Sequence, residues 1–275
     1  MPLTAIRHVR KMRGGAQAHL LEADDHRWYV VKFRNNPQHR RILVNELLAA
    51  EFLEYLKIAV PAGAVVQVSR EFLAANYEVN VSLGTRRLEI EPGWHFGSRY
   101  PGDPGRIAVY DFLPDALLAG VANLDDFRGV LVFDKWVSNA DGRQCVFYRA
   151  RVRRGAEDAA AGKAAFVARM IDHGYAFNGP NWDFPDSPLQ GLYARSLVYD
   201  GVSSLADFEP WLEQVVHFPE EVMDRAWKRI PPEWIEDDDE SLERMLERLF
   251  ERRARVPELI AACRGARVNP FRGWS

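Results

Sequence analysis

The chain reads WYVVKF at residues 28–33 and NELLAAEFLEYLK at residues 45–57. The first run is short, apolar and rich in β-branched and aromatic residues, which predicts a strand. In the second run Leu48, Phe52 and Leu56 recur at every fourth position, which predicts an amphipathic helix. These two runs predict a strand with a lysine near its end, followed by an amphipathic helix. The rest of the fold is assigned from this pattern.

More short strands surround this unit in the first third of the chain. Ala5–Lys11 and Ala18–Glu22 precede it, and Arg13-Gly14-Gly15 between them is typical of a turn. We therefore expect a small antiparallel sheet. The sequence also predicts strands at residues 64–68, 77–83 and 107–112, with a loop at residues 91–105.

The second half of the chain is expected to be mainly helical. A regular apolar stripe lies within residues 239–255, after three consecutive aspartates that suit the start of a helix. A β-like segment at residues 144–152 and a short strand at residues 166–171 enclose a polar loop at residues 153–163. Further helices are predicted at residues 124–133, 205–216 and 219–230.

This order of elements predicts an α+β fold with two lobes. At roughly 100 to 200 residues per domain, the 275 residues suffice for two lobes with a cleft between them. We place the boundary near Pro114. Residues 1–113 would form an N-terminal lobe with an antiparallel sheet and one helix, and residues 114–275 a mainly helical C-terminal lobe.

The charges are nearly balanced overall but unevenly distributed. The net charge of −3 argues against a dedicated nucleic-acid-binding protein. Residues 1–41 hold nine Lys and Arg against three acids, whereas residues 233–251 hold nine acids against two Arg. The two segments therefore carry opposite net charges. Solvated faces of unrelated elements would give the same charge distribution.

Cysteine usage and hydropathy indicate an ordinary intracellular protein. Cys145 and Cys263 are too few for a disulfide framework or a metal-binding pair, so a reducing cytoplasm fits best. The N-terminus carries charges where a signal peptide needs an apolar core. No stretch reaches the roughly 18 apolar residues that a membrane span requires. We expect a cytoplasmic protein without a membrane span.

Several common chemistries are excluded by missing motifs. The seven histidines form no HExxH pair, no serine lies in a GxSxG elbow, and no GxxxxGK[ST] phosphate loop occurs. Zinc hydrolase, α/β-hydrolase and P-loop NTPase functions are therefore disfavoured.

Lys32 and Glu46 are the first polar residues set in apolar surroundings. An ammonium group among Val31, Phe33 and their neighbours costs several kcal/mol to bury unless an anion compensates. Glu46, at the start of the predicted helix, could be that anion. The alternatives are an exposed lysine with its stem on the strand, and a first-turn glutamate that complements the helix dipole.

Two further clusters follow the apolar runs of the second half. Asp134 follows Val-Leu-Val-Phe, and Asn139 lies five residues later, next to Asp141. Asp172 follows a short apolar strand and precedes His173-Gly174. A carboxylate can orient or deprotonate a hydroxyl, and carboxylate and amide oxygens bind divalent cations. Taken singly, these residues also fit ordinary turns.

The sequence contains, in order, the parts that clamp ATP and transfer its γ-phosphoryl group. They are a Gly-rich turn, a Lys on a strand, a Glu on a helix, the motif Asp-x4-Asn, and the motif Asp-x-Gly after a strand. The series is similar to the protein-kinase-like superfamily, and specifically to its HipA-like and phosphatidylinositol-kinase-like branch. The resemblance covers about residues 6 to 177. It rests on the segments RGGAQAHL, WYVVKF, NELLAAEFLEYLKIAVP, FDKWVSNADGR and IDHG.

The resemblance implies a role for each matching residue. Gly14, Gly15 and Gln17 would lie in the phosphate-covering turn, Lys32 would contact the α- and β-phosphates, and Glu46 would anchor Lys32. The backbone near Val109, Tyr110 and Asp111 would hold adenine. Asp134 would be the catalytic base with Asp141 as its rival, Asn139 and Asp172 would bind Mg²⁺, and Arg143 would orient the loop.

Three functions follow as hypotheses. The first is a Mg-ATP-dependent kinase that phosphorylates a hydroxyl of a protein Ser or Thr. A small-molecule or lipid kinase of the same fold is the second, and a nucleotide-binding pseudokinase or scaffold module is the third. The resemblance also raises the idea of an antitoxin-like partner, for which the sequence contains no partner site. The loop from Asn139 to Asp172 is longer than a compact hairpin needs, and no APE-like segment follows it.

Overall fold

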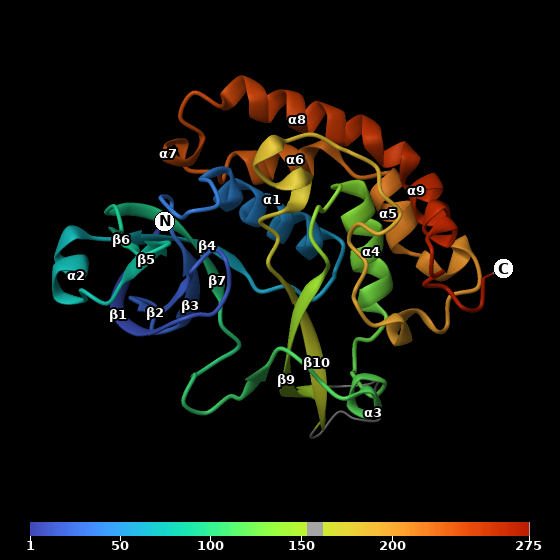
Figure 1. Ribbon diagram of the computed structural model, residues 1–275, viewed down its shortest axis with the longest axis horizontal. Coiled ribbons are helices and arrows are strands. Elements are labelled where there is room, and N and C mark those ends of the chain that lie inside the picture. Colours follow the sequence, from blue (N-terminus) through green and yellow to red (C-terminus); the bar gives the residue numbers. More distant parts are fainter. Residues whose placement is uncertain (153–161, 275) are drawn as a thin grey trace.

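The structure is a computed structural model that describes residues 1–152 and 162–274. Five strands form a closed barrel at one end of the molecule, in the order β1-β2-β3-β7-β4 (Figure 1). Neighbouring barrel strands are antiparallel except for the parallel pair β1 and β4. Their bounds are Leu3–Lys11 for β1, His19–Ala23 for β2, Trp28–Lys32 for β3, Gly63–Val68 for β4 and Gly93–Arg99 for β7.

Strand β7 corrects the prediction of a loop at residues 91–105. It pairs with both β3 and β4 and so closes the barrel. Its sequence GWHFGSR looks like a loop because glycine and serine are poor strand formers. Gly97 is needed there, since a Cβ atom at this position would lie 2.6 Å from Val66 Cγ2.

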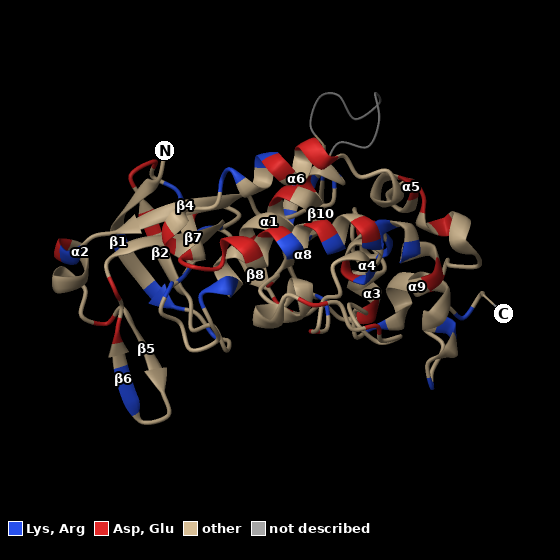
Figure 2. Cartoon of the chain, turned by 90° about the horizontal axis from the view of Figure 1, so that it is seen from above, with Lys and Arg blue, Asp and Glu red and all other residues tan. Residues whose placement is uncertain are grey.

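Two small elements lie outside the barrel. Helix α2 (Arg70–Ala75) begins after Ser69, whose hydroxyl accepts the backbone N–H of Phe72. The hairpin of β5 (Asn80–Leu83) and β6 (Arg86–Glu89) projects away from the barrel (Figure 2). The sequence predicted a strand near β5 but neither α2 nor β6.

Helix α1 (Arg41–Tyr55) begins four residues earlier than predicted and belongs to the core of the second half. Leu47 and Phe52 share a hydrophobic cluster with Phe133 and Trp136, and the rings of Phe52 and Trp136 lie 5.6 Å apart. The barrel has a separate core. The helix therefore connects the strand-rich end of the molecule to the helical end.

The second half contains the predicted helices and the two predicted strands, and a strand predicted for the first lobe joins them in one sheet. Strands β9 (Gln144–Val152) and β10 (Lys163–Ile171) pair along their full length, and β8 (Val109–Tyr110) joins β9. The loop predicted at residues 153–163 lies almost entirely outside the described residues. The helices are α3 (Asp115–Leu118), α4 (Asp126–Trp136), α5 (Trp211–Val216), α6 (Glu220–Trp227), α7 (Pro232–Ile235), α8 (Asp239–Arg252) and α9 (Val256–Ala262).

Short 3₁₀ segments lie at Ala176–Asn181, Ser196–Tyr199, Leu205–Phe208, Arg253–Arg255 and Cys263–Gly265. The helix predicted at residues 205–216 is therefore divided into a 3₁₀ turn and α5. No helix within the described parts of the chain is long and apolar enough to cross a membrane.

The basic N-terminal segment and the acidic C-terminal segment meet beside α1. Arg41 Nε donates to Asp238 Oδ2 at 2.9 Å, and Arg40 pairs with Glu236. Arg41 also donates to the carbonyl of Pro180. The opposite charge surpluses seen in the sequence thus form one contact between α1 and the segment that precedes α8.

His95 is a buried neutral histidine at the closing strand of the barrel. Its Nδ1 accepts the backbone N–H of Arg34 at 3.0 Å, and its Nε2–H donates to the carbonyl of Glu91 at 3.1 Å. Burial, together with the charge of Arg34, lowers the pKa of His95 to about 3. A second proton would place an N–H group of the ring against the N–H group of Arg34.

We therefore expect the folded state to lose stability below neutral pH. Because the folded pKa is depressed from an unfolded value near 6.5, the stabilisation is complete above pH 6.5 and is lost as pH falls towards the folded value. At pH 5, His95 alone lowers the free energy of unfolding by about 2 kcal/mol relative to pH 7. Urea unfolding at both pH values measures the difference.

A matched pair of variants assigns this effect. His95→Gln keeps one hydrogen-bond donor and one acceptor. It should remove about 2 kcal/mol of the difference in the free energy of unfolding between pH 7 and pH 5. His217→Gln, which replaces an exposed histidine in the same way, is the matched control. Equal pH dependence in the wild type and in His95→Gln would contradict the assignment.

Candidate functional site

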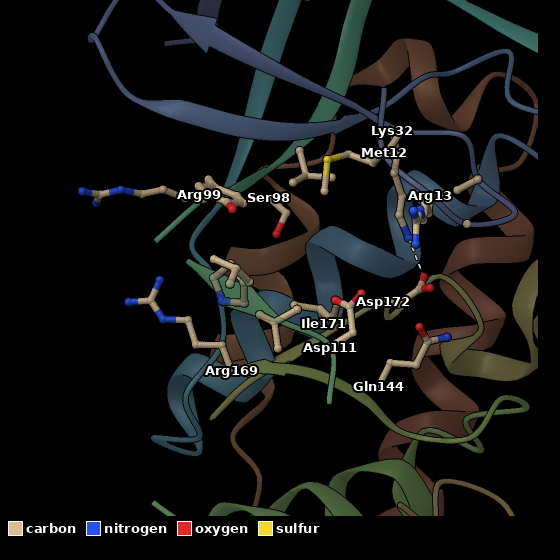
Figure 3. A pocket seen from close by; sticks show the side chains of 18 of the residues that line it. Met12, Arg13, Lys32, Ser98, Arg99, Asp111, Gln144, Arg169, Ile171 and Asp172 are labelled. Carbon is tan, nitrogen blue, oxygen red and sulfur yellow. Dashed lines mark hydrogen bonds and ion pairs between the residues drawn. The ribbon is translucent and has the colours of Figure 1, made fainter. Parts of the chain in front are cut away.

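A cavity of about 500 Å³ lies between the barrel strands and the β9–β10 hairpin (Figure 3). Val30 lines its barrel side, and Val146 and Ile171 line its other side, so it has apolar walls. Charged and polar side chains surround these walls, which is typical of a small-molecule site. Seven of the predicted site residues line the cavity: Gly14, Gln17, Lys32, Glu46, Val109, Asp111 and Asp172.

Lys32 joins two carboxylates at the inner end of the cavity. It is 9% exposed at the end of β3, and its Nζ donates to Asp172 Oδ1 at 2.6 Å and to a Glu46 carboxylate oxygen. Burial alone would lower the pKa of Lys32, but the charges of Glu46 and Asp172 outweigh it, so the pKa is raised. The ammonium group is therefore a fixed positive charge.

Glu46 lies in the second turn of α1 rather than the first, so it faces the cavity instead of capping the helix. It is buried and also accepts a hydrogen bond from the backbone of His173. Asn45 is buried beside it. Its Nδ2 donates to the carbonyls of three residues of the segment after Asp172, and its Oδ1 accepts the indole N–H of Trp182. The three carbonyls are those of Gly174, Ala176 and Gly179.

Asp172 follows β10 in a left-handed backbone conformation, with a φ of 59°. Residues other than glycine rarely adopt this conformation, and such strain is often found at functional sites. Burial favours a raised pKa for Asp172, but the charge and hydrogen bond of Lys32 outweigh it, so the pKa is lowered. Asp172 is therefore a carboxylate at neutral pH.

Asp134 lies in the last turn of α4 and outside the cavity. The side chains of Asp134 and Arg143 are both 0% exposed, and Arg143 donates to both carboxylate oxygens of Asp134. Burial would lower the pKa of Arg143, but the charge of Asp134 outweighs it and the pKa is raised. The two residues form a buried ion pair.

Arg143 extends this ion pair to the segment that carries Asp172. Its Nη1 donates at 3.0 Å to the carbonyl of Ile171 and lies 3.0 Å from His173 Nδ1. Burial and the charge of Arg143 lower the pKa of His173 well below its usual value, so the imidazole is neutral and Nδ1 can accept. The end of α4 is thereby connected to the end of β10.

Asn139 is also buried and faces Asp134 rather than the cavity. Its Nδ2 donates to Asp134 Oδ1 at 3.0 Å, and its Oδ1 accepts the backbone N–H of Asp141 at 3.2 Å. Gly191, with a φ of 71°, covers this pair so closely that a Cβ atom would lie 2.2 Å from Asp134 Cβ. Asp134, Asn139 and Gly191 together fix the loop that carries Asp141.

Asp141 is exposed and is connected to the cavity by Gln144. Gln144 Nε2 donates to Asp141 Oδ2 at 3.2 Å, and its side chain also hydrogen-bonds Asp172. Gln144 lines the cavity (Figure 3). The sequence contained no signal for this position, because only the pairing of Gln144 with Ile171 across the hairpin places both side chains on one face.

The turn between β1 and β2 lies over the cavity. Gly14 has a φ of 121°, which suits glycine. Gln17 lines the cavity, but its amide is paired with Ser82 of β5, donating to its carbonyl and accepting its N–H at 2.6 and 2.7 Å. Gly15 and Tyr110 do not line the cavity.

The oxygen atoms on the cavity wall determine whether a divalent cation fits there. Within residues 1–152 and 162–274 there is no cluster of three or more His, Cys, Asp or Glu side chains that could hold a metal ion. Asp172 and Gln144 nevertheless supply neighbouring carboxylate and amide oxygens on the cavity wall. Mg²⁺ is commonly held by one or two protein oxygens together with water and phosphate oxygens, so these residues fit it.

Two solved structures resemble the fold of this chain. The crystal structure of the Golgi casein kinase is similar, with a TM-score of 0.57 and 13% identity over 97% of this chain and 75% of that chain. The crystal structure of the Golgi casein kinase with Mn/ADP bound has a TM-score of 0.52 and 12% identity over 97% of this chain and 73% of that one. At these identities the likeness concerns the fold.

A search of curated proteins found no match. The family model described as HipA-like kinase matches residues 5–258. This match spans the cavity, the Asp141 loop and most of the helical second half, and it confirms the resemblance drawn from the sequence. The chain belongs to the HipA-like kinase family.

Proposed function

We propose that this protein is a Mg-dependent ATP phosphotransferase that phosphorylates a hydroxyl group of a protein Ser or Thr. The observation that carries the proposal is the contact of Lys32 with both Glu46 and Asp172 at the inner end of the cavity. Three distant parts of the chain supply one cation and two carboxylates there, as nucleotide-dependent kinases require.

The cavity suits a nucleotide. The apolar walls formed by Val30, Val146 and Ile171 would hold adenine, with the backbone near Asp111 at its edge. Lys32 would contact the α- and β-phosphates, and Gly14 in the turn above would let the backbone approach them. Residues 1–113 and 114–275 would then act as two lobes on either side of the nucleotide. Helix α1 lies in the first of these ranges, but its buried side chains pack in the hydrophobic core of the second.

Asp172 and Gln144 are the residues that would hold the metal. When bound, Mg²⁺ neutralises the charge that develops on the phosphate oxygens. Asn139, predicted as a ligand, instead directs its oxygen to the backbone of Asp141. We therefore assign the amide ligand to Gln144 and a positioning role to Asn139.

Asp141 is the residue that we assign as the base. The acceptor oxygen attacks the γ-phosphorus, the bond from that phosphorus to the β–γ bridging oxygen breaks, and ADP leaves with the electron pair. The hydroxyl proton passes to the Asp141 carboxylate. Asp134 has both oxygens engaged by Arg143, so it serves to position Arg143 and Asn139.

The location of Asp141 supports a macromolecular acceptor. Its side chain is exposed on a loop outside the cavity and is reached from the surface. A serine or threonine on a protein surface can approach such a carboxylate without entering the nucleotide cavity.

Incubation with Mg-ATP labelled at the γ-phosphate tests the proposal. The wild type should transfer label to itself or to proteins of a lysate, detected as phosphoserine or phosphothreonine by mass spectrometry. Lys32→Met should reduce transfer by about 100-fold or more, since it removes a charge-assisted phosphate contact. Lys228→Met, which changes an exposed lysine in the same way, should have no effect.

Thermal shift with Mg-ATP separates the alternatives. A bound nucleotide raises the apparent stability by mass action. Stabilisation without any transfer would favour the pseudokinase function. Label found only on small molecules or lipids would replace the protein acceptor, and the absence of both stabilisation and transfer would overturn the proposal.

A further inference from the structure

Arg13 is an exposed cation that leads into the turn between β1 and β2, and it lines the cavity. Figure 3 shows its guanidinium beside Lys32 and above the Asp172 carboxylate. Within the parts of the chain that the structure describes, its side chain has no hydrogen bond or ion pair. An unengaged guanidinium is thus placed at the end of the cavity where Lys32 and Asp172 meet.

The other cations near this turn already have partners. Lys32 is engaged by Glu46 and Asp172, and Lys11 Nζ donates to Gln17 Oε1 at 3.0 Å. Arg10 donates to the hydroxyl of Tyr100 at 3.4 Å. Arg13 is the cation of this turn that remains available for an anion inside the cavity.

The backbone around Arg13 is well fixed. The N–H of Met12 donates to the carbonyl of Ala18 at 2.8 Å, and the N–H of Gln17 donates to the carbonyl of Gly14 at 3.1 Å. The Gln17 amide is in turn paired with Ser82. The turn is closed on itself and attached to β5, so it holds Arg13 over the cavity.

We infer that Arg13 binds the terminal phosphate of ATP. The inference rests on the proposed function and adds a residue that distinguishes ATP from ADP. Lys32 is assigned to the α- and β-phosphates. Gln144 extends from Asp172 towards the proposed base Asp141, so the transferred γ-phosphoryl group must lie at this end of the cavity. Arg13 lies at that same end, and a guanidinium suits two oxygens of a phosphate at once.

Binding of ATP and of ADP, each with Mg²⁺, to wild type and Arg13→Ala by titration calorimetry tests the inference. A charge-assisted hydrogen bond contributes enough to change affinity by about 10- to 100-fold. We expect Arg13→Ala to lose about that factor for ATP and less than about 2-fold for ADP, and Arg13→Lys to lose less for ATP, because it keeps the charge without the paired donors.

Arg99→Ala is the matched control. Arg99 lines the same cavity but lies on the side away from Asp172 (Figure 3), so its loss should not change the ratio of ATP to ADP affinity. Equal losses for ATP and ADP in Arg13→Ala, or no loss for either nucleotide, would overturn the inference alone. A wild type that binds neither nucleotide would overturn the proposed function together with it.

Discussion

The Asp141→Asn variant is expected to lose phosphoryl transfer by about 100- to 10,000-fold, which is the usual contribution of a positioned general base. Asparagine keeps the size of the side chain and can still accept the N–H of Gly142, so the loop should keep its shape. Affinity for Mg-ATP should change much less than transfer, because Asp141 lies outside the cavity and only the hydrogen bond from Gln144 Nε2 to Asp141 Oδ2 is lost. Single-turnover transfer and calorimetric binding measure the two quantities separately.

Two comparisons make this result specific. Asp224→Asn changes an exposed aspartate on α6 in the same way and should transfer at the wild-type rate. Asp134→Asn tests the rival base, and where it remains folded it should keep more activity than Asp141→Asn. The opposite order, with Asp141→Asn active and a folded Asp134→Asn inactive, would return the role of base to Asp134.

Replacement of Asp134 by alanine is expected to lower the free energy of unfolding by about 3 to 5 kcal/mol. The change leaves the Arg143 guanidinium fully buried without its carboxylate, and it also removes the acceptor of Asn139 Nδ2. Urea unfolding of the purified variant measures the loss. An alanine variant as stable as the wild type would contradict the assignment of a buried ion pair.

The double variant Asp134→Leu with Arg143→Met provides the control. Replacing both charges by apolar side chains of similar volume removes the unpaired charge, and such replacements are often close to neutral. The double variant should therefore be more stable than Asp134→Ala. It should still transfer poorly, because Arg143 also donates to the carbonyl of Ile171 next to Asp172.

Much of this site could be predicted from the order of residues along the chain. Lys32, Glu46 and Asp172 were each singled out as polar residues beside apolar runs, and the structure brings all three into contact. Apolar periodicity located α1, because a buried helix face leaves a local signal. The contact among the three charges itself required the tertiary fold.

Asp134 and Gln144 illustrate what the sequence could not decide. The spacing from Asp134 to Asn139 suggested a base and a metal ligand, but α4 continues to Trp136 and buries Asp134 with Arg143. Whether an aspartate after an apolar run is exposed or forms a buried ion pair depends on a partner residue from another segment of the chain. The position of Gln144 beside Asp172 depends on the register of β9 with β10, which the sequence does not show.

Strand β7 was missed for a related reason. Glycines such as Gly97 are unfavourable to a strand in isolation, and only close packing against Val66 and Tyr29 explains them. Barrel closure is a non-local property, so composition alone could not show it.

The hydrogen bonds of Asn45 have a consequence for how α1 can move. One buried side chain of α1 holds three carbonyls of the segment after Asp172 and one indole, while Arg41 on the same helix holds Asp238. Outward swinging of this helix would break these contacts together. Separating Glu46 from Lys32 by such a movement would therefore require all of these contacts to break at once, so α1 and the segment after Asp172 are expected to move as one body.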